Sequence, residues 1–72
     1  MNELVGKSYT FEDGSKIEII QMKAREIEAA LVPCVTYCVS QGRSIPRKLV
    51  MNLTEFVDTY GHLFDLKNAH NQ

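Results

Sequence analysis

The sequence has no excess of charge of either sign, no long hydrophobic run and few cysteines. Eight Lys and Arg residues stand against nine Asp and Glu residues, so the formal net charge is −1 at pH 7. A nucleic-acid-binding domain of this size is usually basic, because contacts with phosphates supply most of its affinity. The charge balance therefore argues against nucleic acid as the default partner, although a local basic patch is compatible with it.

Segments that would place the chain in or across a membrane are also missing. No apolar stretch approaches the roughly 20 residues that a membrane-spanning helix needs. The first residues, Met1 to Leu4, lack the basic segment and the apolar core of a signal peptide. We therefore expect a cytoplasmic protein with no membrane partner.

The two cysteines lie four residues apart, at positions 34 and 38. In a strand, Cys34 and Cys38 would share one face at a separation of roughly 13 Å, which is too far for a disulfide. We expect two reduced, half-buried thiols. Adding His62 and His70 would complete four zinc ligands, but structural zinc sites use closely spaced pairs on tight turns. The spacing therefore argues against a zinc site, and with no other recognisable cofactor site in the sequence we expect neither a metal nor a cofactor.

Seventy-two residues are enough for one domain and too few for two. The apolar fraction of 44% and the charged fraction of 24% are ordinary for a globular chain. We expect one globular domain over residues 1–66 and a polar C-terminal tail over 67–72. A core of this size is marginal, so self-association often adds stability to such a domain.

Alternating polar and apolar residues predict two strands in the first part of the chain. Residues 8–11 alternate, and Asp13-Gly14 after them is the strongest hairpin signal, typical of a type I′ turn. A second strand is predicted over 16–22. Its apolar residues fall on both faces of the strand, which indicates burial on both faces or a bulge near Ile20.

The segment 24–31 is ambiguous. Its residues favour a helix by intrinsic propensity, but the segment is short for a helix and Pro33 ends it. We interpret it as a helical turn or a wide connection between the second and third strands. The alternative is that it forms the end of a long second strand.

Two more strands are predicted after this segment. Residues 34–40 alternate between an apolar and a polar face, and residues 41–44 form a turn. The fourth strand is predicted over 47–51, where Pro46 is tolerated because it stands at the strand start.

A helix is the clearest predicted element. One helical face is formed by Leu53, Phe56, Val57, Tyr60, Leu63 and Phe64. Asn52 is the predicted N-cap, with Glu55 three residues later as in a capping box. Gly61 is a candidate for the end of the helix, with the next three residues folding back.

The order of these elements predicts a small α+β domain. Short connections favour an antiparallel sheet of about four strands with a C-terminal amphipathic helix. The strands have two alternatives: they curl into an SH3-like partly open barrel, or they form a flat sheet under the helix.

Arg43, Arg47 and Lys48 form the one basic cluster of the sequence, around the loop before the fourth strand. Such a cluster could bind phosphate or an acidic peptide. The alternative is a solvated set of charges that keeps a sheet edge from pairing with another chain. These three residues are the candidate binding residues.

No motif in the sequence carries a catalytic mechanism. Asp58 and His62 are four residues apart and could form a general-base pair or a solvated surface pair. Gly6-Lys7-Ser8 lacks the earlier glycine of a phosphate-binding loop. We therefore expect that the protein is not an enzyme.

Several segments together resemble small uncharacterised bacterial and bacteriophage proteins, namely Val35-Thr36-Tyr37, Arg47-Lys48-Leu49-Val50-Met51, Glu55-Phe56 and Tyr60-Gly61-His62-Leu63-Phe64. Those proteins end a β-meander with a similar passage from strand to helix. The resemblance implies no activity, and it implies a phage or microbial cytoplasmic accessory protein.

The function predicted from these observations is a non-enzymatic protein-interaction or self-associating accessory module. Exposed strand edges or an uncovered apolar face would supply its contacts. The alternative is a nucleic-acid-binding accessory protein that uses Arg43, Arg47 and Lys48.

Overall fold

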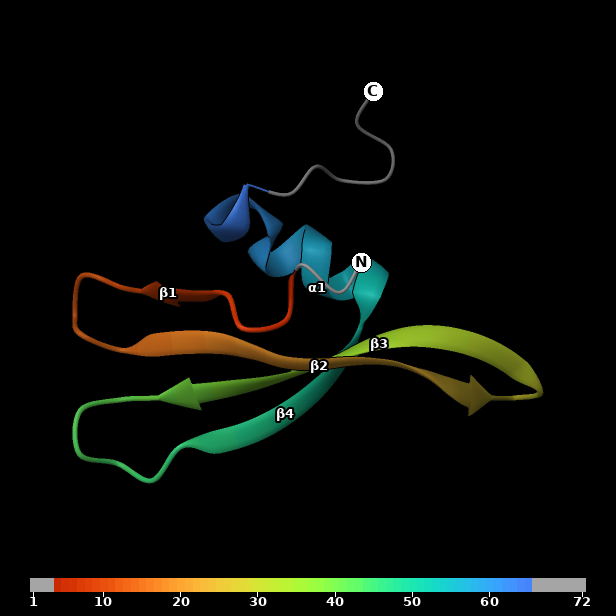
Figure 1. Cartoon of the computed structure of the whole chain (residues 1–72), viewed down its shortest axis with the longest axis horizontal. Coiled ribbons are helices and arrows are strands. Elements are labelled where there is room, and N and C mark those ends of the chain that lie inside the picture. The colour runs from red at the N-terminus through yellow and green to blue at the C-terminus, as the bar shows by residue number, and fades with distance from the viewer. Residues whose placement is uncertain (1–3, 66–72) are drawn as a thin grey trace.

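The computed structural model describes residues 4–65 as a four-stranded antiparallel sheet with two helical segments on one side (Figure 1). The strands lie in the order β1 (Ser8–Thr10), β2 (Lys16–Ile27), β3 (Ala30–Ser40) and β4 (Arg47–Asn52). The helix α1 (Leu53–Tyr60) and the 3₁₀ helix η2 (Gly61–Phe64) follow directly.

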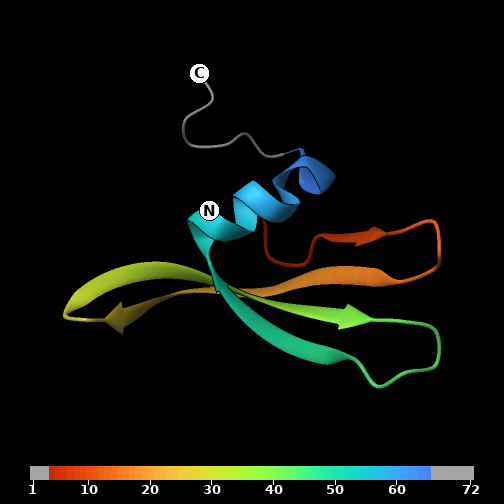
Figure 2. The same ribbon diagram turned by 180° about the vertical axis from the view of Figure 1, so that it is seen from behind.

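The predicted α+β class is confirmed. The sheet is twisted but open (Figures 1 and 2), so the SH3-like barrel is the alternative that does not occur. The predicted polar tail over 67–72 lies outside the described residues. Within residues 4–65, neither helical segment has the length and apolarity needed to span a bilayer.

The segment 24–31 belongs to a long β2–β3 hairpin. Ile27 pairs with Ala30, and the two residues between them, Glu28 and Ala29, have positive φ angles of 51° and 67°. The preferred prediction of a helical turn or connection is wrong, and the alternative of an extended second strand is correct. Cross-strand pairing overrides helical propensity here, because a strand gains its stability from non-local partners.

The first hairpin turn is at the predicted place but is not of the predicted type. Gly14 has a φ of 91°, whereas Asp13 does not have the positive φ that a type I′ turn requires. The N–H of Gly14 donates to the carbonyl of Phe11 over 3.0 Å. The Ser15 hydroxyl and N–H donate to Asp13 Oδ1 over 2.6 and 2.9 Å, and these bonds lower the pKa of the Asp13 carboxyl.

A bulge at Ile20 divides β2 into two parts with opposite alternation. Ile19 pairs with Tyr37, but Gln21 pairs with Thr36, so Ile20 is an extra residue in the strand. Of the two alternatives that the sequence left open, burial on both faces or a bulge near Ile20, the bulge is the one that occurs. Its consequence is that Met22 returns to the side of the sheet that Ile19 faces, where it packs against the core.

A local capping signal fixes the N-terminal end of α1 as predicted, and the α-helix ends just before Gly61, the predicted end. The N–H of Glu55 donates to Asn52 Oδ1 over 2.7 Å, and Asn52 Nδ2 lies 3.4 Å from Glu55 Oε1. Such a cap typically contributes about 1 kcal/mol. The α-helix ends at Tyr60, and the 3₁₀ helix begins at Gly61.

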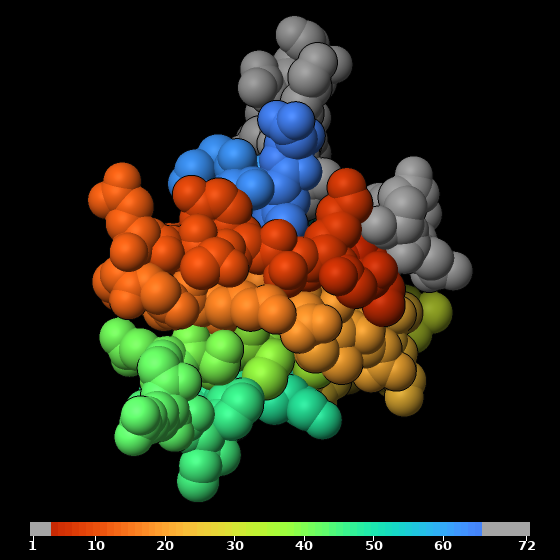
Figure 3. All heavy atoms as spheres, turned by 60° about the vertical axis from the view of Figure 1, so that its left-hand side comes forward, coloured from red at the N-terminus to blue at the C-terminus, as the bar shows by residue number. Residues whose placement is uncertain are grey.

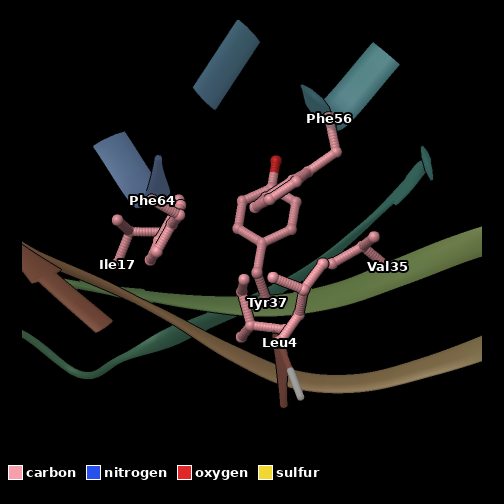
Figure 4. Close-up of a cluster of buried hydrophobic side chains, with 7 residues drawn as sticks. Leu4, Ile17, Val35, Tyr37, Phe56 and Phe64 are labelled. Carbon is pink, nitrogen blue, oxygen red and sulfur yellow. The ribbon is translucent and has the colours of Figure 1, made fainter. Parts of the chain in front are cut away.

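The hydrophobic core lies between the helices and the sheet (Figure 4). The aromatic rings of Tyr37 and Phe56 lie 5.3 Å apart between their centroids, and those of Phe56 and Phe64 lie 6.1 Å apart. The labelled side chains of Figure 4 point toward one another from both layers. The buried cluster consists of Leu4, Ile17, Ile19, Val35, Tyr37, Phe56 and Phe64.

The burial of Tyr37 predicts a loss of stability at alkaline pH. Burial, with Tyr60 and Glu55 nearby, raises the pKa of the Tyr37 phenol above its ordinary value of 10. The phenol therefore ionises first in the unfolded chain, so its contribution is complete below about pH 10 and is lost as pH rises through the higher folded pKa. In urea titrations at pH 8 and above pH 10, Tyr37→Phe should reduce the fall in the free energy of unfolding. Tyr9→Phe, a change at a surface tyrosine, should not reduce this fall. An equal fall in the free energy of unfolding for both variants would contradict the prediction.

Candidate interaction surface

The sheet has a covered face and an uncovered face. The helices lie on the same side as the buried core residues, and no described element packs against the other side (Figures 1 and 2). Figure 3 shows the loop before β4 (green) at the end of the molecule away from the helices (blue). Cross-strand pairing assigns to the uncovered face Ser8, Thr10, Lys16, Glu18, Gln21, Lys23, Arg25, Ile27, Ala30, Val32, Cys34, Thr36, Cys38, Ser40, Lys48 and Val50, among others.

Cations predominate on the uncovered face of the sheet, and carboxylates predominate in the helical layer. The uncovered face carries one carboxylate, Glu18, and four cations, Lys16, Lys23, Arg25 and Lys48. The helical layer, residues 53–65, carries three carboxylates and no Lys or Arg. A net charge close to zero therefore coexists with a cationic face, which the net charge of the sequence does not indicate.

A hollow of about 310 Å³ lies within the uncovered face. Its lining residues are Gln21, Lys23, Arg25, Cys34, Thr36 and Val50. Cys34 is only 5% exposed and pairs directly with Lys23. Lys23 and Arg25 are two residues apart on β2, a spacing of about 6.6 Å along a strand. The hollow therefore brings ammonium, guanidinium, amide and hydroxyl donors together, which suits an anionic ligand.

The predicted basic cluster does not form one site. Arg47 pairs with Val39 and therefore points to the covered side, whereas Lys48 pairs with Cys38 and points to the uncovered face. Arg43 is exposed in the turn at residues 41–44. Lys48 is thus the one member of the cluster that shares a face with Lys23, a residue that the sequence reasoning did not select.

The cysteines and histidines considered as zinc ligands are also separated. Cys34 and Cys38 are free thiols on β3 and both point to the uncovered face. Cys38 is half-buried as predicted, whereas Cys34 is buried. His62 belongs to η2 on the covered side, and His70 lies outside the described residues. Within residues 4–65, no group of three His, Cys, Asp or Glu residues is close enough to hold a metal ion.

A second cleft, of about 590 Å³, lies between the N-terminal segment and η2. Its described lining residues are Lys7, Ser8, His62, Leu63, Phe64 and Asp65. Asp58 is not one of them. The cleft therefore does not join Asp58 and His62, the pair that the sequence suggested as a general base.

Besides the outer side of the three-residue strand β1, two stretches of unpaired strand edge are present in the described part of the chain. β4 has no neighbour on its outer side, and Val50 in its middle is 47% exposed. The β2–β3 hairpin projects past β1 and β4 (Figure 1), and we call its residues 23–33 the ribbon. Leu31, near the ribbon tip, is 76% exposed. Both stretches combine free backbone groups with apolar side chains, which favours contact with another chain.

Comparisons of the chain with protein-family models, with curated proteins and with solved structures found no match. The resemblance to bacterial and bacteriophage β-meander proteins therefore stays a prediction.

Proposed function

We propose that this chain is a non-enzymatic interaction module that self-associates through the free edge of β4. The observation that carries the proposal is the unpaired edge itself, which runs over all six residues of β4. Unpaired strand N–H and C=O groups bind another strand readily. Leu49 and Met51 on this strand are half-buried at the margin of the core, and Val50 between them is exposed.

A second copy of the chain fits this edge without a conflict of charge. In an antiparallel pair about a two-fold axis through Val50, Val50 meets its own copy and Leu49 meets Met51. Lys48 then lies opposite the neutral amide of Asn52 in the other copy. Because no like charges are opposed, this register gains apolar cross-strand contacts without the cost that like-charge pairs carry. A register centred on Lys48 would oppose two lysines and is disfavoured.

The free edge of β2 does not suit a second copy in the same way. Two-fold registers centred on residues 23, 24, 25 and 26 each set like charges opposite one another. They would pair Lys23 with itself, Lys23 with Arg25, Arg25 with itself, and Glu26 with itself. These repulsions favour β4 as the self-associating edge.

Val50→Lys is expected to convert the dimer into a monomer, because it sets two ammonium groups opposite each other at the axis. Light scattering coupled to size exclusion, and sedimentation velocity over a range of concentrations, measure this change. Ile20→Lys makes the same replacement at a residue that is 39% exposed on the β2 bulge, and should leave the dimer intact. Circular dichroism checks that both variants fold.

Two outcomes count against this proposal. A wild-type protein that stays monomeric at every concentration contradicts self-association. A dimer that survives Val50→Lys as well as Ile20→Lys contradicts the β4 edge as its interface.

Nucleic-acid binding is the second candidate function, and the separation of charge favours it. A polyanion on the uncovered face would meet the four cations and would stay away from the carboxylates of the helical layer. A titration with DNA and RNA at two salt concentrations tests this function. Affinity that falls steeply with salt supports it, and an absence of binding at low salt contradicts it.

A further inference from the structure

We propose that the uncovered face of the ribbon enters the major groove of duplex DNA, with Lys23 and Arg25 as its principal contacts. This inference rests on the second candidate function and names the site and the ligand for it. The predicted cluster of Arg43, Arg47 and Lys48 is not the centre of this site.

The shape of the ribbon suits a major groove. Over residues 23–33 it consists of two strands alone, because β1 pairs no further than Glu18 and β4 no further than Cys34. The helices do not extend over its tip (Figures 1 and 2). Paired strands lie about 4.8 Å apart, and the major groove of B-form DNA, about 12 Å wide, admits a two-stranded β-ribbon.

The chemistry of the same face suits the edges of bases and the phosphates beside them. Gln21, Lys23 and Arg25 alternate along β2 on this face, and these residue types bind adenine, guanine and phosphate groups in major grooves. Their neighbours on β3 are short, with Thr36 opposite Gln21 and Cys34 opposite Lys23. The longer β2 side chains therefore stand above the face and are free to reach a ligand.

The remaining cations extend this surface along the sheet. Lys16 and Lys48 lie on the same face, beyond Gln21 and away from the ribbon tip. Four cations that neutralise four phosphates give a slope of about −3.6 for the logarithm of the association constant against the logarithm of salt concentration.

Other nucleic acids and acidic proteins fit this face less well. All aromatic residues in the described chain lie on the covered side, in the first turn or in the helices, so the face has no ring on which single-stranded bases could stack. A-form RNA has a major groove too deep and narrow for side chains to read. Docked peptide strands use pockets for alternate side chains, whereas four of the six residues that line the hollow on this face are polar or charged.

The test compares two double variants with the same change of charge. Lys23→Glu/Arg25→Glu reverses the ribbon cations, and Arg43→Glu/Arg47→Glu reverses two cations away from the ribbon. Fluorescence anisotropy with one sequence as a DNA duplex, a DNA single strand and an RNA duplex measures binding. We expect the DNA duplex to bind tightest, the ribbon variant to lose roughly 100-fold in affinity and the control to change much less. Lys23→Gln/Arg25→Gln, which only removes charge, should also lose affinity, and circular dichroism checks the fold of each variant.

Failure of the inference and failure of the function give different results. If the wild type binds none of the three nucleic acids, nucleic-acid binding itself fails. If it binds but the Arg43/Arg47 variant loses affinity and the ribbon variant does not, the site is overturned. Equal binding of the RNA duplex or the single strand overturns insertion into the major groove. Binding of polyglutamate in place of DNA assigns the face to an acidic protein and also overturns the inference.

Discussion

Replacing Phe56 with alanine is expected to lower the free energy of unfolding by about 3–5 kcal/mol. The Phe56 side chain is fully buried, and its ring lies within 6.1 Å of those of Tyr37, Tyr60 and Phe64 between centroids. Because these rings come from both layers, neither layer alone can close the cavity that the missing Phe56 ring would leave. A domain of this length is stabilised by only about 4–11 kcal/mol, so the loss should unfold a large fraction of molecules on mild warming.

Urea denaturation followed by circular dichroism measures this loss. Thr59→Ala changes an exposed residue of the same helix and should alter stability by less than about 0.5 kcal/mol. A Phe56→Ala protein within about 1 kcal/mol of the wild type would contradict the central position of Phe56 in the core.

Replacing Glu28-Ala29 with Asn-Gly is expected to raise the free energy of unfolding by about 1–2 kcal/mol. Both residues have positive φ angles, which Asn and Gly adopt at lower cost than Glu and Ala. For a domain of this size, that gain corresponds to an increase in Tm of about 5–15 °C. Amide hydrogen exchange should also slow in the ribbon, because its turn would open less often.

The control for this replacement separates charge from backbone conformation. Glu28→Gln removes the carboxylate but keeps a side chain that resists a positive φ, so it should change stability by less than about 0.5 kcal/mol. If Asn-Gly leaves both the Tm and the ribbon exchange rates unchanged, the strain assigned to this turn is absent.

Local signals in the sequence were sufficient for the helix and for much of the sheet. The cap formed by Asn52 and Glu55 depends on residues three positions apart, and strict alternation placed Val35 and Tyr37 on the covered face. These features depend on neighbours along the chain, which is why they were predictable. The β2–β3 turn was not, because its conformation is imposed by the pairing of Ile27 with Ala30 and not by the residues Glu28 and Ala29.

The candidate site was harder to predict than the fold. Arg47 and Lys48 are adjacent in sequence, but strand alternation sends them to opposite faces, and the period of two could have shown this. Lys23 and Arg25 were overlooked for a different reason. The segment from residue 24 had a helical propensity, and the face of each cation depends on a bulge whose exact position only the pairing register defines.

The bulge takes residue 20 out of the alternation of β2, so that Ile19 and Gln21 lie on opposite faces as if they were adjacent. If residue 20 were instead paired as an ordinary strand residue, alternation would continue unbroken from Ile19, and Lys23 and Arg25 would lie on the same side of the sheet as Ile19. Met22 would then turn toward solvent. Deletion of residue 20 should therefore leave Lys23 and Arg25 on their present face, because Gln21 would then follow Ile19 directly in the alternation. The position of the bulge, and not the identity of residue 20, therefore decides which face of the sheet each later side chain of β2 occupies.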